Sequence, residues 1–314
     1  MIYFRPLGGL CNRIRAMDSI ISLAIDYGHK VIVLWVQNEK CNCPYSSLFK
    51  PPENTDIKIV EVKHELEISK VYALDNYEES IHENFKIIFP TVHLDDFLLN
   101  KELSSVYNWK LYNGIKSSEE IDALFIKKID LKLKKLLAKE TIYITSCYRL
   151  SPLKNKYTFF KPIDKIVKKV DAITIKFNNT IGVHIRRTDH IVSKKYSALK
   201  KFELEMGKYI LQEDSTTFYL STDCKETKNQ LVSKFKNRII KQEINSYDRN
   251  DKTAIKEALV DLLALSKSKK IIGSYLSSFT DMAADIGGLE KQIIKSNVSY
   301  KAYLKYYLKR LYAS

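Results

Sequence analysis

The side chains best suited to chemistry stand at the end of one apolar stretch. Residues 180–185 carry no acidic or basic charge and are rich in β-branched side chains, which predicts a short buried strand. The polar groups at and beyond its end are His184, Arg186, Arg187 and Asp189. Two adjacent guanidiniums present planar sets of donors that match phosphate oxygens, so the pattern predicts a phosphate site. The alternative is a surface Arg–Asp ion pair, which contributes little to stability.

More polar side chains follow the later predicted strands: Thr222, Asp223, Ser277 and Ser278. Each has an ordinary interpretation as a turn or a helix N-cap. In an open α/β sheet, however, ligands bind outside the carboxyl ends of the strands. Together these groups predict a pocket with arginines for phosphate, hydroxyls and helix amides for oxygen atoms, and a carboxylate for a base or a ribose. Asp261 is a candidate for binding a guanine edge, or else a solvated helix carboxylate.

The opening of the chain has a second candidate ligand site. A strand predicted over 2–4 runs into two glycines that permit a tight turn, and a helix and a buried strand over 31–36 follow. This order is typical of a Rossmann-like half. Arg13 and Arg15 fall in the first turn of the helix, where cations beside a helix N-terminus suit a phosphate or a sugar acid. Plain solvation is the alternative.

The chain of 314 residues is long enough for two domains. We expect an N-terminal domain over 1–140, a C-terminal domain over 141–292, and a terminal helix over 293–314. The region from 40 to 115 is hard to interpret, with strand-like pieces at 57–62 and 86–89, and a helix is predicted from 117 to 139. Beyond it, helices, one of them over 162–175 with Pro162 in its first turn, alternate with strands predicted over 141–147, 180–186, 217–222, 238–241 and 270–273.

Composition limits the partners. The net charge of +15 invites nucleic acid, an anionic membrane surface or an anionic small substrate. The lysines are spread along the chain and no nucleic-acid motif is present, so we expect no nucleic-acid partner. Residues 300–312 place tyrosines on one helix face with lysines beside them, which suits peripheral contact with anionic lipid or packing on the chain's own domain.

The sequence predicts a cytoplasmic protein. Its five cysteines lack the spacing of a disulfide framework, and it has neither a signal-peptide pattern nor a long apolar run. Cys41 and Cys43 would need distant partners to bind a metal, so structural thiols are the preferred interpretation. No Asp-x-Asp pair is present to hold a divalent ion for a departing diphosphate. The P-loop and Gly-x-Ser-x-Gly patterns are absent as well, against an NTPase or a hydrolase. We therefore expect no metal, and Arg186 and Arg187 to take its place.

The stretch from Gly182 to Asp189 resembles the His-x-Arg-Arg-x-Asp signature of the GDP-fucose-dependent fucosyltransferases. It is most like the α1,6 branch, which includes the nodulation fucosyltransferase and the N-glycan core fucosyltransferase. The resemblance continues in family order through residues 218–223, 261–266 and 275–278, and more loosely through 8–15. It implies a GT-B fold, with two Rossmann-like domains facing a cleft. It also implies inverting, metal-independent transfer of fucose from GDP-fucose to a glycan acceptor, in a surface polysaccharide or a glycolipid.

By matching positions, the resemblance makes Arg186 and Arg187 the catalytic groups. It implies donor contacts from Gly9, Asn12, Arg13, His184, Asp189, Thr222, Asp223, Asp261, Ser277 and Ser278, and no cofactor beyond the donor. The chain departs from the family where Cys224 and Phe279 replace an aspartate and a glutamine, and where residues 190–195 lack the carboxylate proposed as the base. Asp18, His190, a carboxylate of the middle region or the departing phosphate remain candidates for that role. Another GDP-sugar, or a non-enzymatic nucleic-acid- or membrane-binding role, are the alternative functions.

Overall fold

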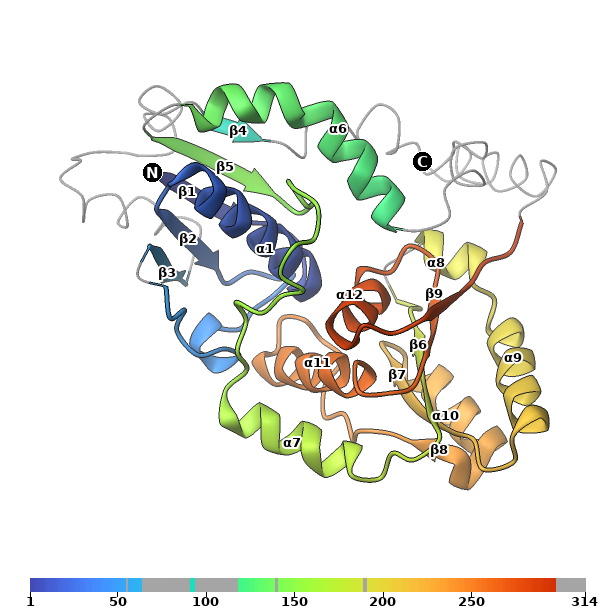
Figure 1. Ribbon diagram of the computed structural model, residues 1–314. Coiled ribbons are helices and arrows are strands. Elements are labelled where there is room, and N and C mark those ends of the chain that lie inside the picture. Colours follow the sequence, from blue (N-terminus) through green and yellow to red (C-terminus); the bar gives the residue numbers. More distant parts are fainter. Residues whose placement is uncertain (55, 64–90, 94–117, 139–140, 189–190, 298–314) are drawn as a thin grey trace, which may run out of the picture. The chain divides into compact units, whose positions relative to one another are not determined.

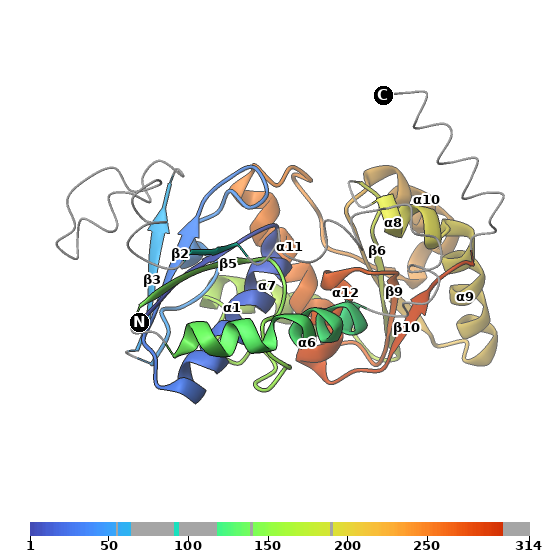
Figure 2. The same ribbon diagram turned by 90° about the horizontal axis from the view of Figure 1, so that it is seen from above.

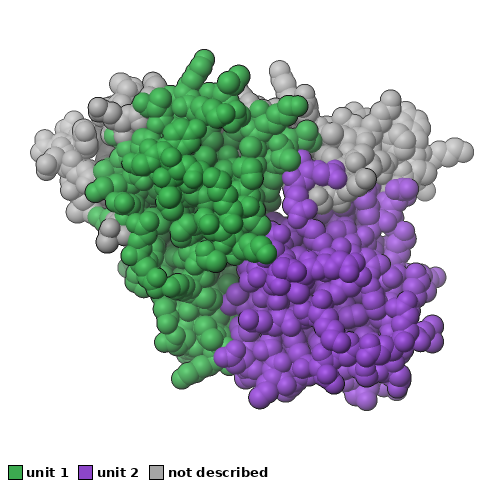
Figure 3. Space-filling model, viewed as in Figure 1, with its two compact units in different colours: residues 1–97, 122–169, 244–260 green, residues 98–121, 170–243, 261–314 purple. Residues whose placement is uncertain are grey.

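The computed structural model describes the chain except residues 55, 64–90, 94–117, 139–140, 189–190 and 298–314 (Figure 1). The chain divides into two compact units, coloured separately in Figure 3. The first comprises Met1–Phe97, Asp122–Lys169 and Ile244–Val260, and the second comprises Leu98–Ile121, Val170–Glu243 and Asp261–Ser314.

The first unit is built on a parallel sheet with the strand order β3-β2-β1-β5-β4. Its strands are β1 (Ile2–Pro6), β2 (Val31–Val36), β3 (Ile57–Val62), β4 (Thr91–His93) and β5 (Ile142–Ser146). Its helical elements are α1 (Leu10–Tyr27), the 3-10 turn η1 (Tyr45–Ser47), α6 (Ser118–Leu137, which begins in the other unit) and α7 (Asp164–Thr174, which ends there). Gly28 ends α1 in the left-handed conformation, with φ of 67°, and its backbone N–H donates to the last turn of the helix.

The second unit contains another parallel sheet, with the order β10-β9-β6-β7-β8. Its strands are β6 (Thr180–Ile185), β7 (Thr217–Thr222), β8 (Ile239–Ile240), β9 (Ile271–Ser274) and β10 (Lys291–Ile294). The helical elements are α8 (Ile191–Tyr196), α9 (Leu199–Gln212), α10 (Lys225–Phe235), η4 (Lys236–Arg238), α11 (Lys252–Leu265, which begins in the other unit) and α12 (Ser278–Gly287). Its first strand in the chain, β6, is central, so the strand order changes direction between β6 and β9. Ligands bind at such a point in open α/β sheets.

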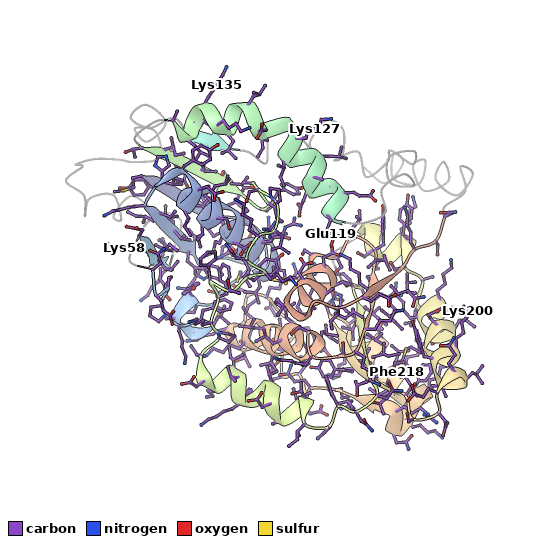
Figure 4. All side chains as sticks on the ribbon, viewed as in Figure 1. Lys58, Glu119, Lys127, Lys135, Lys200 and Phe218 are labelled. Atoms are coloured by element: carbon purple, nitrogen blue, oxygen red, sulfur yellow. The ribbon has the colours of Figure 1, made fainter. Side chains whose placement is uncertain are left out.

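The two faces of β6 have different neighbours. Val183 and Ile185 are fully buried in a core that includes Phe202 of α9 and Phe218 of β7. Figure 2 shows α9 and α10 on one side of this sheet and α12 on the other, and Figure 4 labels Phe218 of the core and Lys200 on the exposed side of α9. Because side chains alternate along a strand, His184 points to the side of α12.

Most of the expected elements are confirmed, with strands at 31–36, 57–62 and 217–222 as predicted. The domain boundary at residue 140 needs correction, because β5 pairs with β1 and belongs to the first sheet. A periodic pattern identifies a buried strand but not the sheet it joins. Pro162 is not in the first turn of α7: it forms a bridge with Phe49 two residues before the helix begins.

Three elements, β4, α8 and β10, are additions to the predicted set. They are short, and short elements carry too little periodicity to be recognised. The strand-like piece at 86–89 lies outside the described residues, as does most of the terminal helix predicted over 293–314, including residues 300–312. The predicted start of that helix needs correction, because residues 293 and 294 belong to β10. Among the helices that the structure describes, none combines the length and apolar character that a membrane crossing requires.

Candidate functional site

The residues directly after β6 form a short turn, Arg186, Arg187 and Thr188, here called the arginine loop. Asp223, one residue beyond β7, binds this loop at several points. Its carboxylate accepts hydrogen bonds from the Arg187 amide at 2.6 Å and from the Thr188 amide and hydroxyl at 3.3 and 2.7 Å. It also lies 3.6 Å from Nε of Arg186. Parallel register pairs Ile185 with Thr222, and so the residue after Thr222 comes level with Arg186.

A second tether comes from the other neighbouring strand. Oγ of Ser274, the last residue of β9, accepts the backbone N–H of Arg186 at 3.0 Å. The arginine loop is thus fixed on both sides of the central strand. Because its backbone is held by side chains of rigid strands, its two guanidiniums start from defined positions.

The two guanidiniums lie in partly enclosed surroundings. The Arg186 side chain is 20% exposed. Arg187 is partly buried, and its Nη2 has no hydrogen-bond partner among the described residues. Burial lowers the pKa of Arg187 from its ordinary value, although a guanidinium keeps its charge in proteins. An enclosed N–H without an acceptor costs free energy, so the position favours an anionic ligand that would accept from it.

His184 is deeply buried on the α12 side of β6. Its Nδ1 lies 2.8 Å from Oγ1 of Thr280 and 3.4 Å from Oγ of Ser277. Its ring stacks on Phe279, with centroids 4.6 Å apart. Burial lowers the pKa of His184 to about 3, so the imidazole is neutral at physiological pH. It can therefore offer one N–H donor to a ligand but no charge.

The N-terminus of α12 lies at the carboxyl end of β9 (Figure 1). Ser277 is its N-cap and makes no side-chain capping bond, so the first-turn amides keep their capacity to donate. Leu276, just before the cap, has φ of 51°, a left-handed conformation that a residue with a side chain adopts at a cost. Such a helix terminus suits a phosphate. Ser278, the first helical residue, is partly exposed.

Asp261 lies on α11 and is buried, in contrast to the solvated alternative. It accepts hydrogen bonds from Tyr219 at 2.5 Å, Ser221 at 2.9 Å and the amide of Gln242 at 2.9 Å. Lys228 donates to the carbonyl of Gln242 and extends this network. Burial raises the pKa of Asp261 to about 6. The carboxylate thus joins α11, β7 and the segment after β8.

Thr222 ends β7 with its side chain enclosed. Its Oγ1 has no hydrogen-bond partner among the residues described. Six predicted site residues, His184, Arg186, Arg187, Thr222, Asp223 and Ser277, therefore lie on or just beyond three adjacent strands of one sheet. Asp189 and His190 lie outside the described residues.

In the first unit the prediction for Arg13 needs correction. Arg13 has no exposed surface, and its guanidinium donates to the carbonyls of Gly8 and Val36 and to Oδ1 of Asn38. The same group lies over the Trp35 ring, 5.0 Å from its centroid. The Arg13 side chain is therefore neither solvated nor directed at a ligand. We assign it a structural role, in which it stabilises the glycine turn through its hydrogen bond to Gly8. The sequence pattern does not show whether an arginine at this position of a helix is buried or exposed.

Arg15 is not solvated either: its side chain is 11% exposed, its Nε donates to the carbonyl of Cys147 at 3.0 Å, and its Nη1 lies 3.6 Å from Asp122. The two other donor contacts predicted in this unit, Gly9 and Asn12, remain near the surface. Gly9 is the N-cap of α1 and is partly exposed, as is Asn12 in the first turn. Gly8 has φ of 80°, in the region that favours glycine. Gly9 and Asn12 thus stay available to a ligand at this helix N-terminus.

Asp18 does not suit the role of a base. Its carboxylate has no exposed surface and pairs with Nη2 of Arg149 at 2.7 Å. Burial raises its pKa despite that pairing. Cys41 and Cys43 are buried free thiols, and burial raises the pKa of Cys43 to about 12, in line with structural roles. Among the described residues, no group of three or more His, Cys, Asp or Glu side chains is placed to hold a metal ion.

Two residues of the site escaped the sequence reasoning: Thr280 and Gln242. Each of them contacts a site residue that is distant in sequence. Thr280 lies 96 residues from His184, and Gln242 lies 19 residues from Asp261. The alternation of β6 indicates that His184 faces away from the core of Val183. It does not indicate which helix residue meets it there.

Comparison with solved protein structures identifies the fold of the chain. No family model matches the chain, and no curated protein sequence matches it. Solved structures do. NodZ α-1,6-fucosyltransferase soaked with GDP-fucose superposes with a TM-score of 0.53 at 16% identity, covering 91% of this chain and 92% of that one. The chain has the GT-B fold of the fucosyltransferases.

Two further structures agree. A mutant of Arabidopsis thaliana FUT1 in complex with GDP gives a TM-score of 0.54 at 13% identity, over 93% of this chain and 69% of that one. Fucosyltransferase NodZ from Bradyrhizobium gives 0.53 at 14% identity, with 90% of each chain covered. The expected α/β architecture of the GT-B type, with two Rossmann-like sheets, is thereby confirmed. At these identities the likeness concerns the fold.

Proposed function

We propose that the protein is an inverting glycosyltransferase that moves fucose from GDP-fucose to a glycan acceptor without a metal ion. The observation that carries this proposal is the arginine loop, placed at the carboxyl end of the central strand and tethered by Asp223 and Ser274. The fold supports it, because similar structures include a fucosyltransferase soaked with GDP-fucose and another in complex with GDP.

The proposed chemistry follows from where charge develops. The acceptor hydroxyl oxygen forms a bond to the anomeric carbon while the bond from that carbon to the phosphate oxygen breaks, so negative charge accumulates on the departing diphosphate. The hydroxyl proton goes to the departing phosphate, which is one of the candidates for the base. Arg186 and Arg187 stabilise that charge, with help from the first-turn amides of α12. Donors that are preorganised for a transition-state charge commonly give the largest catalytic contribution. Since both guanidiniums belong to the protein, the leaving group needs no divalent ion.

The donor contacts we propose follow the same sheet edge. His184 donates one N–H, Ser277 and Ser278 contact phosphate oxygens, and Thr222 supplies an enclosed hydroxyl. Two carboxylates act indirectly, by positioning other groups: Asp261 binds the side chain of Gln242, and Asp223 binds the arginine loop. Asp189, Gly9 and Asn12 complete the proposed donor contacts.

Two side chains, Cys224 and Phe279, make a GDP-sugar other than GDP-fucose a second candidate for the donor substrate. Cys224 forms the N-cap of α10 directly after Asp223, and Phe279 covers one face of His184. A thiol is a weaker acceptor than a carboxylate, and a phenyl ring donates no conventional hydrogen bond. Because these two side chains replace residues that the fucosyltransferase family carries at the matching positions, another GDP-deoxyhexose or a GDP-heptose is the second candidate donor.

The first test is a thermal-shift panel of GDP, UDP and CDP with their sugars, since a ligand that binds only the folded state raises its melting temperature. We expect a rise with GDP and a larger rise with one GDP-sugar. GDP release is then followed with a panel of surface glycans and glycolipids, with and without chelator. Loss of turnover in chelator would overturn the metal-independent mechanism, and a UDP-specific shift would overturn the donor assignment.

We also propose a cytoplasmic site of action, with peripheral membrane contact through residues 300–312. A glycolipid acceptor would favour such contact. Sedimentation with vesicles of anionic and of neutral lipid tests it, with a chain that ends at residue 297 as the control. Equal sedimentation of both chains would contradict the proposal.

A further inference from the structure

A buried hydrogen bond joins β6 to α12 beside the arginine loop. Oγ1 of Thr280 lies 2.8 Å from Nδ1 of His184. Thr280 has no exposed surface, and His184 is 4% exposed. The bond is therefore shielded from water, which would otherwise compete for both groups.

The close approach of Thr280 depends on the neighbouring strand. Gly273 of β9 is the register partner of His184, and a Cβ built on it would lie 2.1 Å from Cγ2 of Thr280. Any side chain at that position would push the helix away from the sheet. The absence of one lets the threonine hydroxyl reach the imidazole.

The burial of the Thr280 hydroxyl determines which atom donates in its hydrogen bond with His184. Among the described residues, Nδ1 of His184 is the sole hydrogen-bond partner of Oγ1 of Thr280. A buried hydroxyl proton must find an acceptor, so Thr280 donates and Nδ1 accepts. Oγ of Ser277 also lies on the Nδ1 side, at 3.4 Å. A neutral imidazole carries a single proton, which is then on Nε2.

We infer that Thr280 is a positioning residue: it holds His184 as the Nε2–H tautomer, so that the ring presents a fixed donor to an oxygen of the bound nucleotide-sugar. This inference rests on the proposed function for the identity of the ligand. Within the described part of the chain, Nε2 makes no hydrogen bond. Unlike Nη2 of Arg187, Nε2 is not a fully enclosed atom, so a ligand oxygen such as that of a phosphate or a ribose can reach its N–H. Stacking on Phe279 fixes the plane of the ring and hence the direction of the N–H.

The variant pair Thr280→Val and Thr280→Ser isolates the hydroxyl. Valine keeps the branched shape that packs against Gly273, whereas serine keeps the hydroxyl and loses the methyl. Nitrogen-15 spectra of the full chain, labelled at its six histidines, report the tautomer of each ring directly. His184→Gln serves only to assign the signal.

In the wild-type chain we expect a protonated Nε2 and an unprotonated, hydrogen-bonded Nδ1. Thr280→Val should shift the Nδ1 signal towards a mixture of tautomers, and Thr280→Ser should restore it. A proton on Nδ1 in the wild type, or an unchanged spectrum in Thr280→Val, would overturn the inference. Should the valine variant fail to fold, the wild-type spectrum decides the tautomer, and addition of GDP-fucose should then move the Nε2 signal far more than the Nδ1 signal.

Calorimetric titration with GDP-fucose or GDP provides the second readout. Loss of one neutral hydrogen bond predicts a dissociation constant about five-fold weaker in Thr280→Val, with wild-type affinity in Thr280→Ser. Equal affinity in all three chains would overturn the link between tautomer and ligand. Failure of the wild type to bind GDP or its sugars would overturn the proposed function and the ligand half of this inference, while the spectra would still support or refute the role of Thr280 toward His184.

Discussion

Asp223 lies one residue beyond β7 and accepts the backbone N–H of Arg187, on the neighbouring strand end, at 2.6 Å. The same carboxylate holds the amide and hydroxyl of Thr188. The sequence resemblance implies a donor contact for Asp223, whereas its described hydrogen bonds are to the arginine loop. This relationship makes the position of the two proposed catalytic cations, Arg186 and Arg187, depend on a residue that need not touch the substrate.

We therefore expect Asp223→Asn to lower kcat by about 10²-fold, the order of a lost transition-state donor, because an amide cannot accept at all three points. KM for the donor should rise less. Initial rates of GDP release measure both. Asp214→Asn is the matched control, since Asp214 binds Arg238 in an exposed ion pair, and exposed pairs contribute little. Equal kcat in both variants would refute a positioning role.

Replacement of Arg187 tests the catalytic cation itself. Arg187→Ala should lower kcat by about 10²–10³-fold, because the proposed role of the side chain is to stabilise charge that develops in the transition state. The melting temperature should hold or rise, since a partly buried N–H without an acceptor is removed. Arg187→Lys should restore little, as an ammonium cannot form the planar paired contact. Lys200→Ala, on the exposed side of α9, is the control, and full activity of Arg187→Ala would contradict the assignment.

The two glycines Gly273 and Gly207 make a matched pair for stability. Gly273→Ala places a Cβ against Thr280, and overpacking of this kind costs about 1–3 kcal/mol. Gly207 lies within α9 with nothing within 4 Å of a Cβ, so Gly207→Ala should stabilise the protein by roughly 0.5–1 kcal/mol. Urea unfolding measures both changes. Equal effects of the same sign would show that the contact with Thr280 does not constrain β9.

The sequence predicted the strands that carry the site because apolar runs such as 180–185 and 217–222 are sharply bounded by polar residues. It also placed Arg186, Asp223 and Ser277 at strand ends, where the structure has them. What it could not show was contact between distant elements. The burial of Arg13 under Trp35 and the approach of Thr280 to His184 depend on packing between segments, which periodicity within one segment does not encode.

The buried carboxyl of Asp261 predicts a pH effect whose sign can be worked out. Its pKa rises from 3.8 to about 6 on folding because of burial, so between these values the folded state binds more protons than the unfolded state. The contribution of this group to stability is therefore full below pH 3.8 and is lost as the pH rises through about 6. Asp261→Asn carries no such proton. The free energy of unfolding of the variant minus that of the wild type should increase from pH 4 to pH 7, by on the order of 1–3 kcal/mol. Urea unfolding of both chains at several pH values measures this difference, in which contributions from all other groups cancel. A difference that stays constant over this range would show that Asp261 is ionised throughout, and that Tyr219, Ser221 and Gln242 offset its burial completely.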